Sequence, residues 1–225
     1  MGQKVNPISF RLAVKKNWRS KWFNDKKYPL LVAQDIIIRK AINSKLGRNA
    51  GVNLIEIERN PQETIINIYT SKPGIIIGRS GQGINDLKAE IERQIQKTKF
   101  SLLGIHDKKI EQIGKIKINI MEVRNPESNA TLIAQNIASQ LEKRVAYRRA
   151  IKMAIDKAMQ DRDVKGIKIG VAGRLGGVEI ARREKFSQGS IPLSAFRSNI
   201  DYVQLDAFTT YGTIGIKVWV YKKNK

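Results

Sequence analysis

Five cations crowd into one short stretch in the second half of the chain, and only Glu142 offsets them: Lys143, Arg144, Arg148, Arg149 and Lys152. If one helix runs through this stretch, Arg144, Arg148 and Lys152 share a face and Arg149 flanks it. A solvated helix face usually mixes charges of both signs. The pattern therefore favours a surface that binds nucleic acid, and the alternative is an ordinary solvated face.

The whole chain is strongly basic. Its 225 residues include 42 Lys and Arg against 20 Asp and Glu, which gives a formal net charge of +22 and a pI of about 10.3. Residues 1–50 hold 12 basic and 2 acidic residues, residues 51–125 hold 12 and 9, and residues 126–225 hold 18 and 9. An excess of this size favours a polyanion as partner, most commonly nucleic acid. The alternatives are anionic lipid or a role in solubility alone.

Few residues are available for catalysis. The absence of cysteine excludes disulfides, thiolate metal sites and cysteine nucleophiles. The single histidine, His106, lies in a polar stretch and is predicted to be a solvated loop residue. We therefore predict no enzyme, no metal and no cofactor. No run approaches the roughly 20 apolar residues of a membrane span, and the N-terminus lacks a signal-peptide core and a myristoylation pattern, which predicts a soluble intracellular protein.

Residues 1–28 are predicted to form an extended basic arm with a short structured end. Its cations surround Trp18, Trp22 and Phe23, and no sustained period runs through it. The aromatic residues either anchor the arm to the protein or stack on bases, and anchoring is the favoured interpretation. The cations are expected to contact phosphate.

Periodic patterns begin after the arm and predict one domain over residues 29–125. The expected elements, in order, are a helix capped by Asp35, strands at 53–59 and 66–69, a short helix at 75–77, a glycine loop at 78–81, a long helix carrying Ile84, Leu87, Ile91 and Ile95, and a strand at 116–120.

The run from Ile76 to Ile84 resembles the signature of the KH domain, and the element order resembles its type II form, αββααβ. In KH domains the GxxG loop joins two helices and grips the backbone of about four single-stranded nucleotides. The resemblance implies that the RNA-binding loop is Gly78, Arg79, Ser80 and Gly81. Its glycines leave room for a phosphate, helix N-terminal amides donate to it, and Arg79 adds a cation. The alternative is a plain helix–helix turn, since the spacing fits neither a P-loop nor a dinucleotide fingerprint.

Two amphipathic helices followed by alternating strands predict a second, α+β domain over residues 126–225. The helices are expected to pack on a mostly antiparallel four-stranded sheet. Its strands are expected at 167–171, 178–180, 203–207 and 214–220. Cations in the loop and strand at 173–185 suit phosphate contact, with surface solubility as the alternative: Arg174, Arg182, Arg183 and Lys185.

Long collinear segments resemble the small-subunit ribosomal protein S three family, a universal ribosomal protein with a type II KH domain, in its bacterial or organellar form. These segments span almost the whole chain, at 1–7, 73–78, 140–145, 148–152, 173–182 and 210–219. The resemblance implies a structural protein on the head of the small subunit, on cytoplasmic ribosomes or in an organelle matrix. It implies rRNA contacts through the second domain and the arm, and no membrane or small-molecule partner.

The resemblance also implies particular residues. The residues expected to bind rRNA are Gln3, Lys4, Asn6, Arg11, Arg174, Arg182, Arg183 and Lys185. Family members help form the channel through which mRNA enters, beside two other small-subunit proteins, and a basic helix there helps to unwind structured mRNA. The matching positions are Arg148, Arg149 and Lys152, with Arg144 beside them. Unwinding of this kind needs no nucleotide site, because translocation by the ribosome supplies the work.

Two features depart from the family pattern. Ser80 stands where many members carry a second basic residue, and the segment at 97–114 is longer than the usual bacterial connection. Two other functions stay open as alternatives. A KH-containing transcription elongation or antitermination factor would usually carry paired KH modules, whereas one GxxG loop is present here. A DNA-repair lyase or nuclease would need a nucleophilic lysine or a carboxylate–metal cluster, and no constellation favours either.

Overall fold

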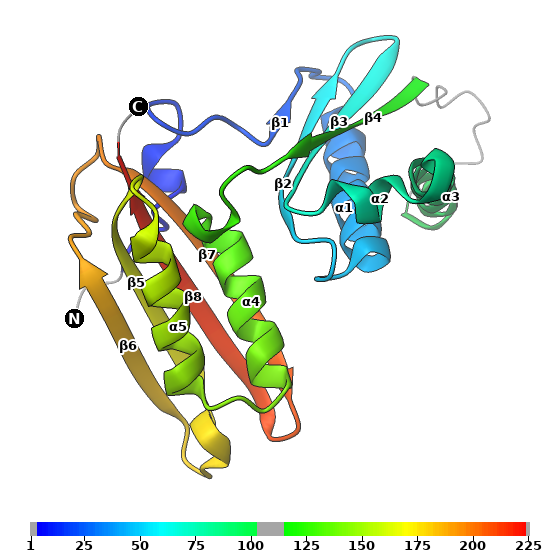
Figure 1. The fold of residues 1–225 in the computed structure, drawn as a ribbon. Helices are drawn as coiled ribbons and strands as arrows, with labels where there is room; N and C mark the ends of the chain where they lie inside the picture. Colours follow the sequence, from blue (N-terminus) through cyan, green and yellow to red (C-terminus); the bar gives the residue numbers. More distant parts are fainter. Residues whose placement is uncertain (1–3, 103–114, 224–225) are drawn as a thin grey trace. The chain divides into compact units, whose positions relative to one another are not determined.

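Figure 1 shows the computed structural model, which describes residues 4–102 and 115–223. The chain divides into two compact units. The first unit is Arg19–Arg124, and the second combines Met1–Trp18 with Asn125–Lys225. Each unit has its own sheet and its own hydrophobic core.

Two sequence predictions fall outside the described residues, namely the positions of Gln3 and His106. Among the residues that are described, no helix combines the length and the apolar character needed to cross a bilayer. Within the same residues, no three His, Asp or Glu side chains lie together as a possible metal site.

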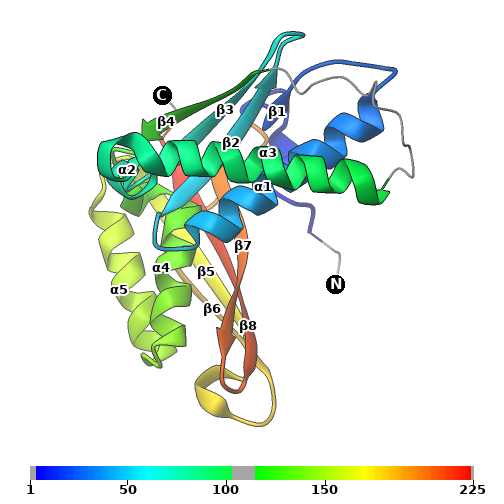
Figure 2. The ribbon, with the colours of Figure 1, turned by 90° about the vertical axis from the view of Figure 1, so that its right-hand side faces the viewer.

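The first unit has the predicted αββααβ order, preceded by a short strand that was not predicted from the sequence. Its elements are β1 (Ser20–Lys21), α1 (Tyr28–Leu46), β2 (Val52–Arg59), β3 (Glu63–Thr70), α2 (Pro73–Ile77), α3 (Gln82–Leu102) and β4 (Lys115–Glu122). The sheet order is β1-β2-β3-β4, in which β2 and β3 are antiparallel and the two outer pairs are parallel. Figure 2 shows α1 and α3 lying across this unit.

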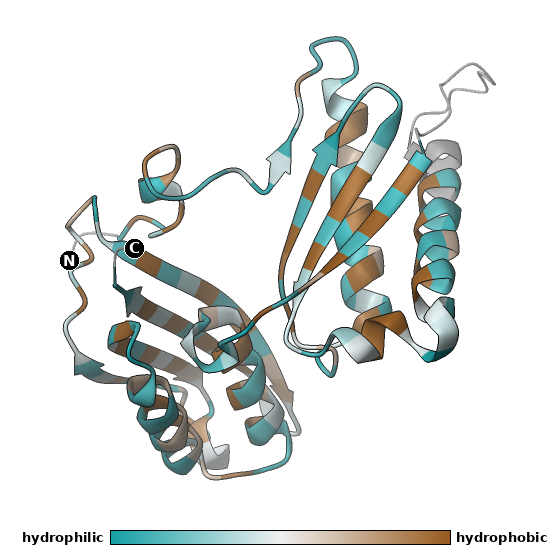
Figure 3. Cartoon of the chain, turned by 45° about the horizontal axis from the view of Figure 1, so that its top comes forward, coloured by the Kyte–Doolittle hydropathy of each residue, from teal (hydrophilic) through white to brown (hydrophobic). Residues whose placement is uncertain are grey.

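The core of the first unit consists mostly of isoleucine. Alternate residues along β2 and β3 are buried, and Figure 3 shows the resulting bands of hydrophobic and hydrophilic residues along the strands. The helices contribute side chains at the predicted four-residue spacing, including Ile38, Ile42, Leu87, Ile91 and Ile95. β-Branched residues suit the strand interior, and here they fill the helix side of the same core as well.

Asp35 is not the cap of a helix, contrary to the sequence prediction. Helix α1 begins at Tyr28 with Pro29 in its first turn, a position that proline's fixed φ favours. Asp35 is buried inside α1. Its carboxylate accepts hydrogen bonds from Arg59 Nη2 at 2.6 Å and from Trp22 Nε1 at 2.8 Å. The carboxylate therefore joins β2 and the chain ahead of α1 to the helix.

The second unit packs two helices on a four-stranded antiparallel sheet, as predicted. Its elements are α4 (Ala130–Glu142), α5 (Tyr147–Gln160), β5 (Val164–Gly173), β6 (Arg182–Gly189), β7 (Asn199–Thr209) and β8 (Gly212–Lys222). The strand order is β6-β5-β8-β7. The inward residues of β5 and β8 form one core with both helices, and α4 and α5 lie on the same face of the sheet (Figure 1).

The prediction of a strand at 178–180 is wrong, because β6 begins at Arg182. Val178 and Ile180 are exposed and belong to the loop that precedes the strand. The apolar alternation at 178–180 suggested a buried strand, whereas β6 lies at the sheet edge and Phe186 is its only residue that packs against the core. A polar edge strand lacks the pattern that sequence reasoning uses.

The N-terminal segment is folded and is shared between the units. Residues 4–18 belong to the second unit, where Arg11 is fully buried. In the first unit, β1 pairs with β2, and Trp22 packs against Tyr28 with ring centroids 5.5 Å apart. Trp22 is therefore an anchor, as the favoured interpretation expects, whereas Trp18 and Phe23 are 65% and 86% exposed.

Candidate nucleic-acid interfaces

The predicted RNA-binding loop lies between α2 and α3, where Arg79–Gly81 form a short 3-10 turn. Gly78 and Gly81 adopt φ angles of 69° and 77°, and Ser80 adopts 51°. This left-handed region costs about 1–2 kcal/mol for a residue with a side chain. Arg79 and Ser80 are both exposed. The turn therefore presents its two variable side chains to solvent on a backbone that the glycines make possible.

A third glycine, which sequence reasoning did not single out, fixes this turn. A Cβ atom on Gly83 would lie 2.5 Å from the carbonyl oxygen of Ile76 and 2.9 Å from that of Ile77. The end of α2 and the start of α3 therefore meet backbone against backbone. The glycine spacing in the run from Gly78 to Gly83 is the signal that could have identified this contact.

The basic cluster of the second unit is not on one continuous helix. Helix α4 ends at Glu142, and Arg144 adopts a φ of 61°. The N–H of Val145 donates to the carbonyl of Gln140, and the N–H of Arg144 donates to that of Leu141. This is a Schellman C-cap with arginine where glycine is usual. The condition for a face shared by Arg144, Arg148 and Lys152, one helix through the whole stretch, is therefore not met, because the backbone turns between the first residue and the other two.

Lys143 is the C-cap of α4, and the other three cations of the cluster, Arg148, Arg149 and Lys152, are exposed on α5. Arg148 is held by a neighbour, since its Nη2 lies 3.2 Å from Glu184 Oε1. The hydroxyl of Tyr147 donates to the same oxygen at 2.8 Å. These hydrogen bonds, first from Tyr147 and then from Arg148, lower the pKa of Glu184. A polyanion that binds Arg148 must therefore compete with a carboxylate.

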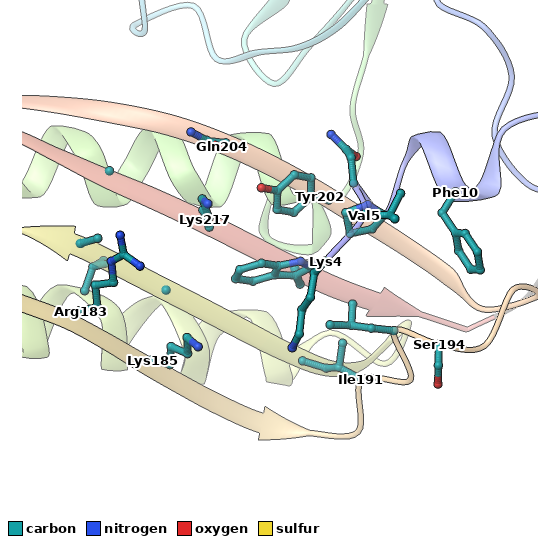
Figure 4. Close-up of a pocket in the computed structure, with 18 of the residues that line it drawn as sticks. Lys4, Val5, Phe10, Arg183, Lys185, Ile191, Ser194, Tyr202, Gln204 and Lys217 are labelled. Atoms are coloured by element: carbon teal, nitrogen blue, oxygen red, sulfur yellow. The ribbon is translucent and has the colours of Figure 1, made fainter. Parts of the chain in front are cut away.

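Residues predicted to bind rRNA meet on the sheet face that the helices leave open. This face is hollowed into a groove of about 1330 Å3, which we call the sheet groove (Figure 4). It is lined mainly by the outward side chains of β5 to β8, together with residues 4–7 and 191–194. Lys4, Arg183 and Lys185 come together there, and Lys217 joins them.

The sequence prediction missed several residues of the sheet groove. Trp219, Tyr202 and Gln204 line it as well, and Lys168 faces Trp219 across the strand pair β5–β8. Each of these residues lies on a strand whose core-facing residues had been identified from the sequence. Because side chains of a strand alternate between the two faces of a sheet, the residues between the core-facing ones must lie on the opposite face. The alternation in the sequence could therefore have identified them.

Positive charges crowd one another on this face. Burial lowers the pKa of Lys168, and the charges of Lys4 and Lys185 lower it further. Because neighbouring positive charges destabilise the protonated form of Lys168, a bound anion would stabilise that form. The sheet groove therefore has the electrostatics of an anion site.

Asn6 and Arg11 also line the sheet groove but have partners within the protein, and Arg174 and Arg182 lie outside it. Arg11 is buried, with its guanidinium on backbone carbonyls, and Asn6 Oδ1 accepts from the N–H of Ile8. Arg174 Nε donates to the carbonyl of Val178 at 2.9 Å, and its guanidinium lies 5.8 Å from the ring centroid of Tyr211. Arg182 is exposed at the start of β6.

The first unit, with its αββααβ order and its exposed glycine turn between α2 and α3, defines a KH-domain protein. The family model described as "KH domain" matches residues 37–128. The model described as "Ribosomal protein S3, C-terminal domain" matches residues 137–220 in the second unit.

Relatives match nearly the full chain. The small ribosomal subunit protein uS3c of Guillardia theta is 49% identical over 98% of this chain and 95% of that protein. The small ribosomal subunit protein uS3 of Clostridium botulinum (strain Okra / Type B1) is 49% identical over 99% of this chain and 92% of its own length. That of Clostridium acetobutylicum is 46% identical over 98% and 92%. The chain belongs to the ribosomal protein S3 family, which confirms the resemblance found in the sequence.

Proposed function

We propose that this protein is a structural RNA-binding component of the small ribosomal subunit, with no catalytic role. The observation that carries the proposal is the gathering of Lys4, Arg183, Lys185 and Lys217 on one open sheet face, from chain segments far apart in sequence. Cations grouped in this way neutralise phosphates and position a protein on RNA without reading bases. Arg174 and Arg182 extend this rRNA-binding surface along β6 and the loop before it.

The glycine loop is proposed to hold a second RNA segment. With Gly78 and Gly81 in positive φ, a phosphate can approach the backbone, and Arg79 supplies the cation. Ser80 contributes a hydroxyl in place of a second charge, so this grip is weaker than that of a loop with two cations.

The exposed cations of α5 are proposed to contact mRNA where it enters the subunit, next to neighbouring small-subunit proteins. Arg149 and Lys152 are exposed on α5, Arg148 is shared with Glu184, and Arg144 precedes the helix. Cations that bind single strands bias base-pair opening, while translocation supplies the work. This mechanism needs no bound nucleotide, and the sequence contains no P-loop motif.

Sucrose-gradient sedimentation of a cell lysate tests the proposal. We expect the protein to sediment with small subunits at low salt, and to stay with them after magnesium chelation separates the subunits. Sedimentation at the top of the gradient in low salt would overturn the ribosomal proposal. Sedimentation with RNA polymerase instead would favour the transcription-factor alternative.

A further inference from the structure

Some glycines of the second sheet are required by the fold and others are not. A Cβ atom on Gly166, Gly173 or Gly189 would lie within 2.8 Å of backbone atoms, so no side chain fits there. A Cβ atom on Gly170 would meet nothing closer than the Trp219 ring at 3.5 Å. One on Gly215 would meet nothing closer than Asp206 Oδ1 at 3.6 Å. Both are ordinary contact distances.

Gly170 and Gly215 therefore weaken their strands without a steric need. Neither has a positive φ, and the register of β5 is regular around Gly170. Glycine inside a strand costs about 0.5–1 kcal/mol relative to alanine, and it otherwise marks a place where a ligand or a backbone approaches closely. Both residues line the sheet groove, as does Ala172, which pairs with Gly215 and lies two residues from Gly170 on β5. The floor of the groove is thus bare backbone and one methyl group.

One lysine lies on each side of this floor. In the register of the sheet, Gly170 pairs with Lys185 on β6 and with Lys217 on β8. Neighbouring strands lie about 4.8 Å apart, so the backbones that carry the two lysines are about 10 Å from each other with Gly170 midway. Figure 4 shows both lysines on the open face. An anionic group that rests on Gly170 can be reached by both.

An aromatic pair lies one row further along the strands. Trp219 pairs across the sheet with Lys168 on one side and Tyr202 on the other. The ring centroids of Trp219 and Tyr202 are 5.3 Å apart, and Lys168 Nζ lies 5.8 Å from the Trp219 ring centroid. A cationic row beside an aromatic row is the arrangement that binds single-stranded nucleic acid, because phosphates meet the cations and bases stack on the rings.

Acidic groups are few on this face. Glu184 is engaged by Tyr147 and Arg148, and Asp206 Oδ1 lies 3.6 Å from the position of a Cβ atom on Gly215. The cations that line the groove are Lys4, Arg11, Arg183, Lys185 and Lys217, and Lys168 lies beside the Trp219 ring. Charge complementarity therefore favours a polyanion over an apolar or mixed protein surface.

We propose that the sheet groove is a single-strand site: an RNA phosphate rests on Gly170 between Lys185 and Lys217, and the adjoining unpaired base stacks on Trp219. This inference rests on the proposed ribosomal function, and it specifies how the second unit holds rRNA. A duplex does not satisfy the site, because paired bases have no free face for the indole.

The first test uses the full chain with small-subunit rRNA and with a ten-nucleotide oligoadenylate. We expect the double variant Lys185→Ala, Lys217→Ala to reduce the slope of log K against log salt by about 0.7, the amount for one lost single-strand phosphate contact. The matched control removes Lys157 and Arg162, two exposed cations on or just after α5, and should leave the slope unchanged. An unchanged slope in the double variant overturns the proposal.

The aromatic row has its own test. Trp219→Leu should weaken binding of the oligoadenylate about tenfold, while Trp219→Phe should keep most of the affinity, since both retain apolar volume and only one can stack. Ultraviolet crosslinking of the rRNA complex should place a nucleotide adduct on the peptide that contains Trp219. Equal affinity of the two variants, or an adduct confined to other peptides, contradicts the stacking role.

A substitution at Gly170, in the floor of the groove, gives the most specific test, because the stability of the protein should not fall while its affinity for RNA should. Gly170→Ala should leave the protein as stable as the parent or more stable, while RNA affinity falls. Unchanged affinity overturns the close approach of phosphate.

The outcomes separate the two proposals. If rRNA still binds while all groove variants behave as the parent, the single-strand site is wrong and the ribosomal proposal stands. If the parent binds no RNA, both fail. If polyglutamate competes as well as RNA and Trp219→Leu has no effect, the groove binds an acidic protein segment instead.

Discussion

The Nε of Arg11 donates a hydrogen bond of 2.8 Å to the backbone carbonyl of Ser198, 187 residues further along the chain. Its Nη2 donates to the carbonyls of Leu193 and Ala195 at 2.9 and 2.8 Å. The side chain is fully buried. A guanidinium spread over several carbonyls satisfies several acceptors at once, so this arginine fastens the N-terminal segment to the loop before β7.

Arg11→Ala should lower the free energy of unfolding by about 2–4 kcal/mol, because the buried carbonyls of Ser198 and Pro7 and the part-buried ones of Leu193 and Ala195 lose their donor at once. Arg11→Lys should recover little, since an ammonium cannot span the same set of acceptors. Denaturant unfolding measures the loss, and hydrogen exchange of residues 191–198 locates it. Lys15→Ala, at an exposed position of the same segment, is the matched control and should change stability by less than about 0.5 kcal/mol.

Gly83→Ala should destabilise the first unit by about 1–3 kcal/mol, because its methyl group would overlap the carbonyl oxygens of Ile76 and Ile77. Gly81→Ala has open space around its Cβ and should cost only about 1–2 kcal/mol for its left-handed backbone. Thermal unfolding of both variants makes the comparison. A Gly83→Ala protein as stable as the parent would show that α2 and α3 separate at no cost.

Arg144→Gly should stabilise the second unit by about 1 kcal/mol, since glycine adopts the left-handed C-cap conformation without strain. Arg144→Ala removes the same charge but keeps the strain and should not stabilise. The two variants therefore separate the backbone effect from the loss of a cation. Arg149→Gly, inside α5, is the control and should cost about 1 kcal/mol in unfolding measurements. Equal stability of the glycine and alanine variants at position 144 would contradict the strained cap.

Tyr147→Phe should raise the pKa of Glu184, because the Tyr147 hydroxyl is the first cause of its lowering. A carboxylate whose pKa is lower in the folded state adds stability above its unfolded pKa. That contribution is lost as the pH falls through the folded pKa. Carbon-13 NMR titration of the glutamate carboxyls follows the change, and Tyr211→Phe is the control that should leave it unaltered. If the titration midpoint of Glu184 is the same in Tyr147→Phe and parent, the hydroxyl is not its donor.

Replacement of Arg148, Arg149 and Lys152 by alanine should leave subunit assembly largely intact and slow translation through stable mRNA hairpins. Translation of unstructured message should slow less, because fewer base pairs need to open. A reconstituted translation system with paired templates makes the measurement, and Lys157→Ala on the same helix is the control. Equal slowing on both templates would argue against an unwinding role.

The sequence predicted most of the fold because buried residues repeat at helix and strand periods. Strands β2, β3 and β4 and the long helix α3 carry isoleucine at these spacings, and each lies where it was expected. The two failures have different causes. β6 is polar and buries only one side chain, and Asp35 lies buried inside α1, whose first turn holds Pro29.

The candidate sites were predictable only in part. Lys4, Arg183 and Lys185 were identified as cations, but their meeting on one face depends on strand order, which periodicity does not specify. For Arg11 the sequence suggested a binding role that the structure does not support. A basic residue in a basic segment suggests phosphate contact, and only the tertiary structure reveals that its donors are occupied by carbonyls.

The division of the N-terminal segment between the units has a consequence for synthesis. Residues 19–124 form a contiguous unit that can fold soon after it emerges, whereas Arg11 must wait for Ser198. At roughly 5–20 residues per second, a separation of 187 residues corresponds to a delay of about 10–40 seconds. During that interval the cationic N-terminal segment of the nascent chain is not yet docked. A chaperone or RNA can bind the segment before it packs onto the second unit.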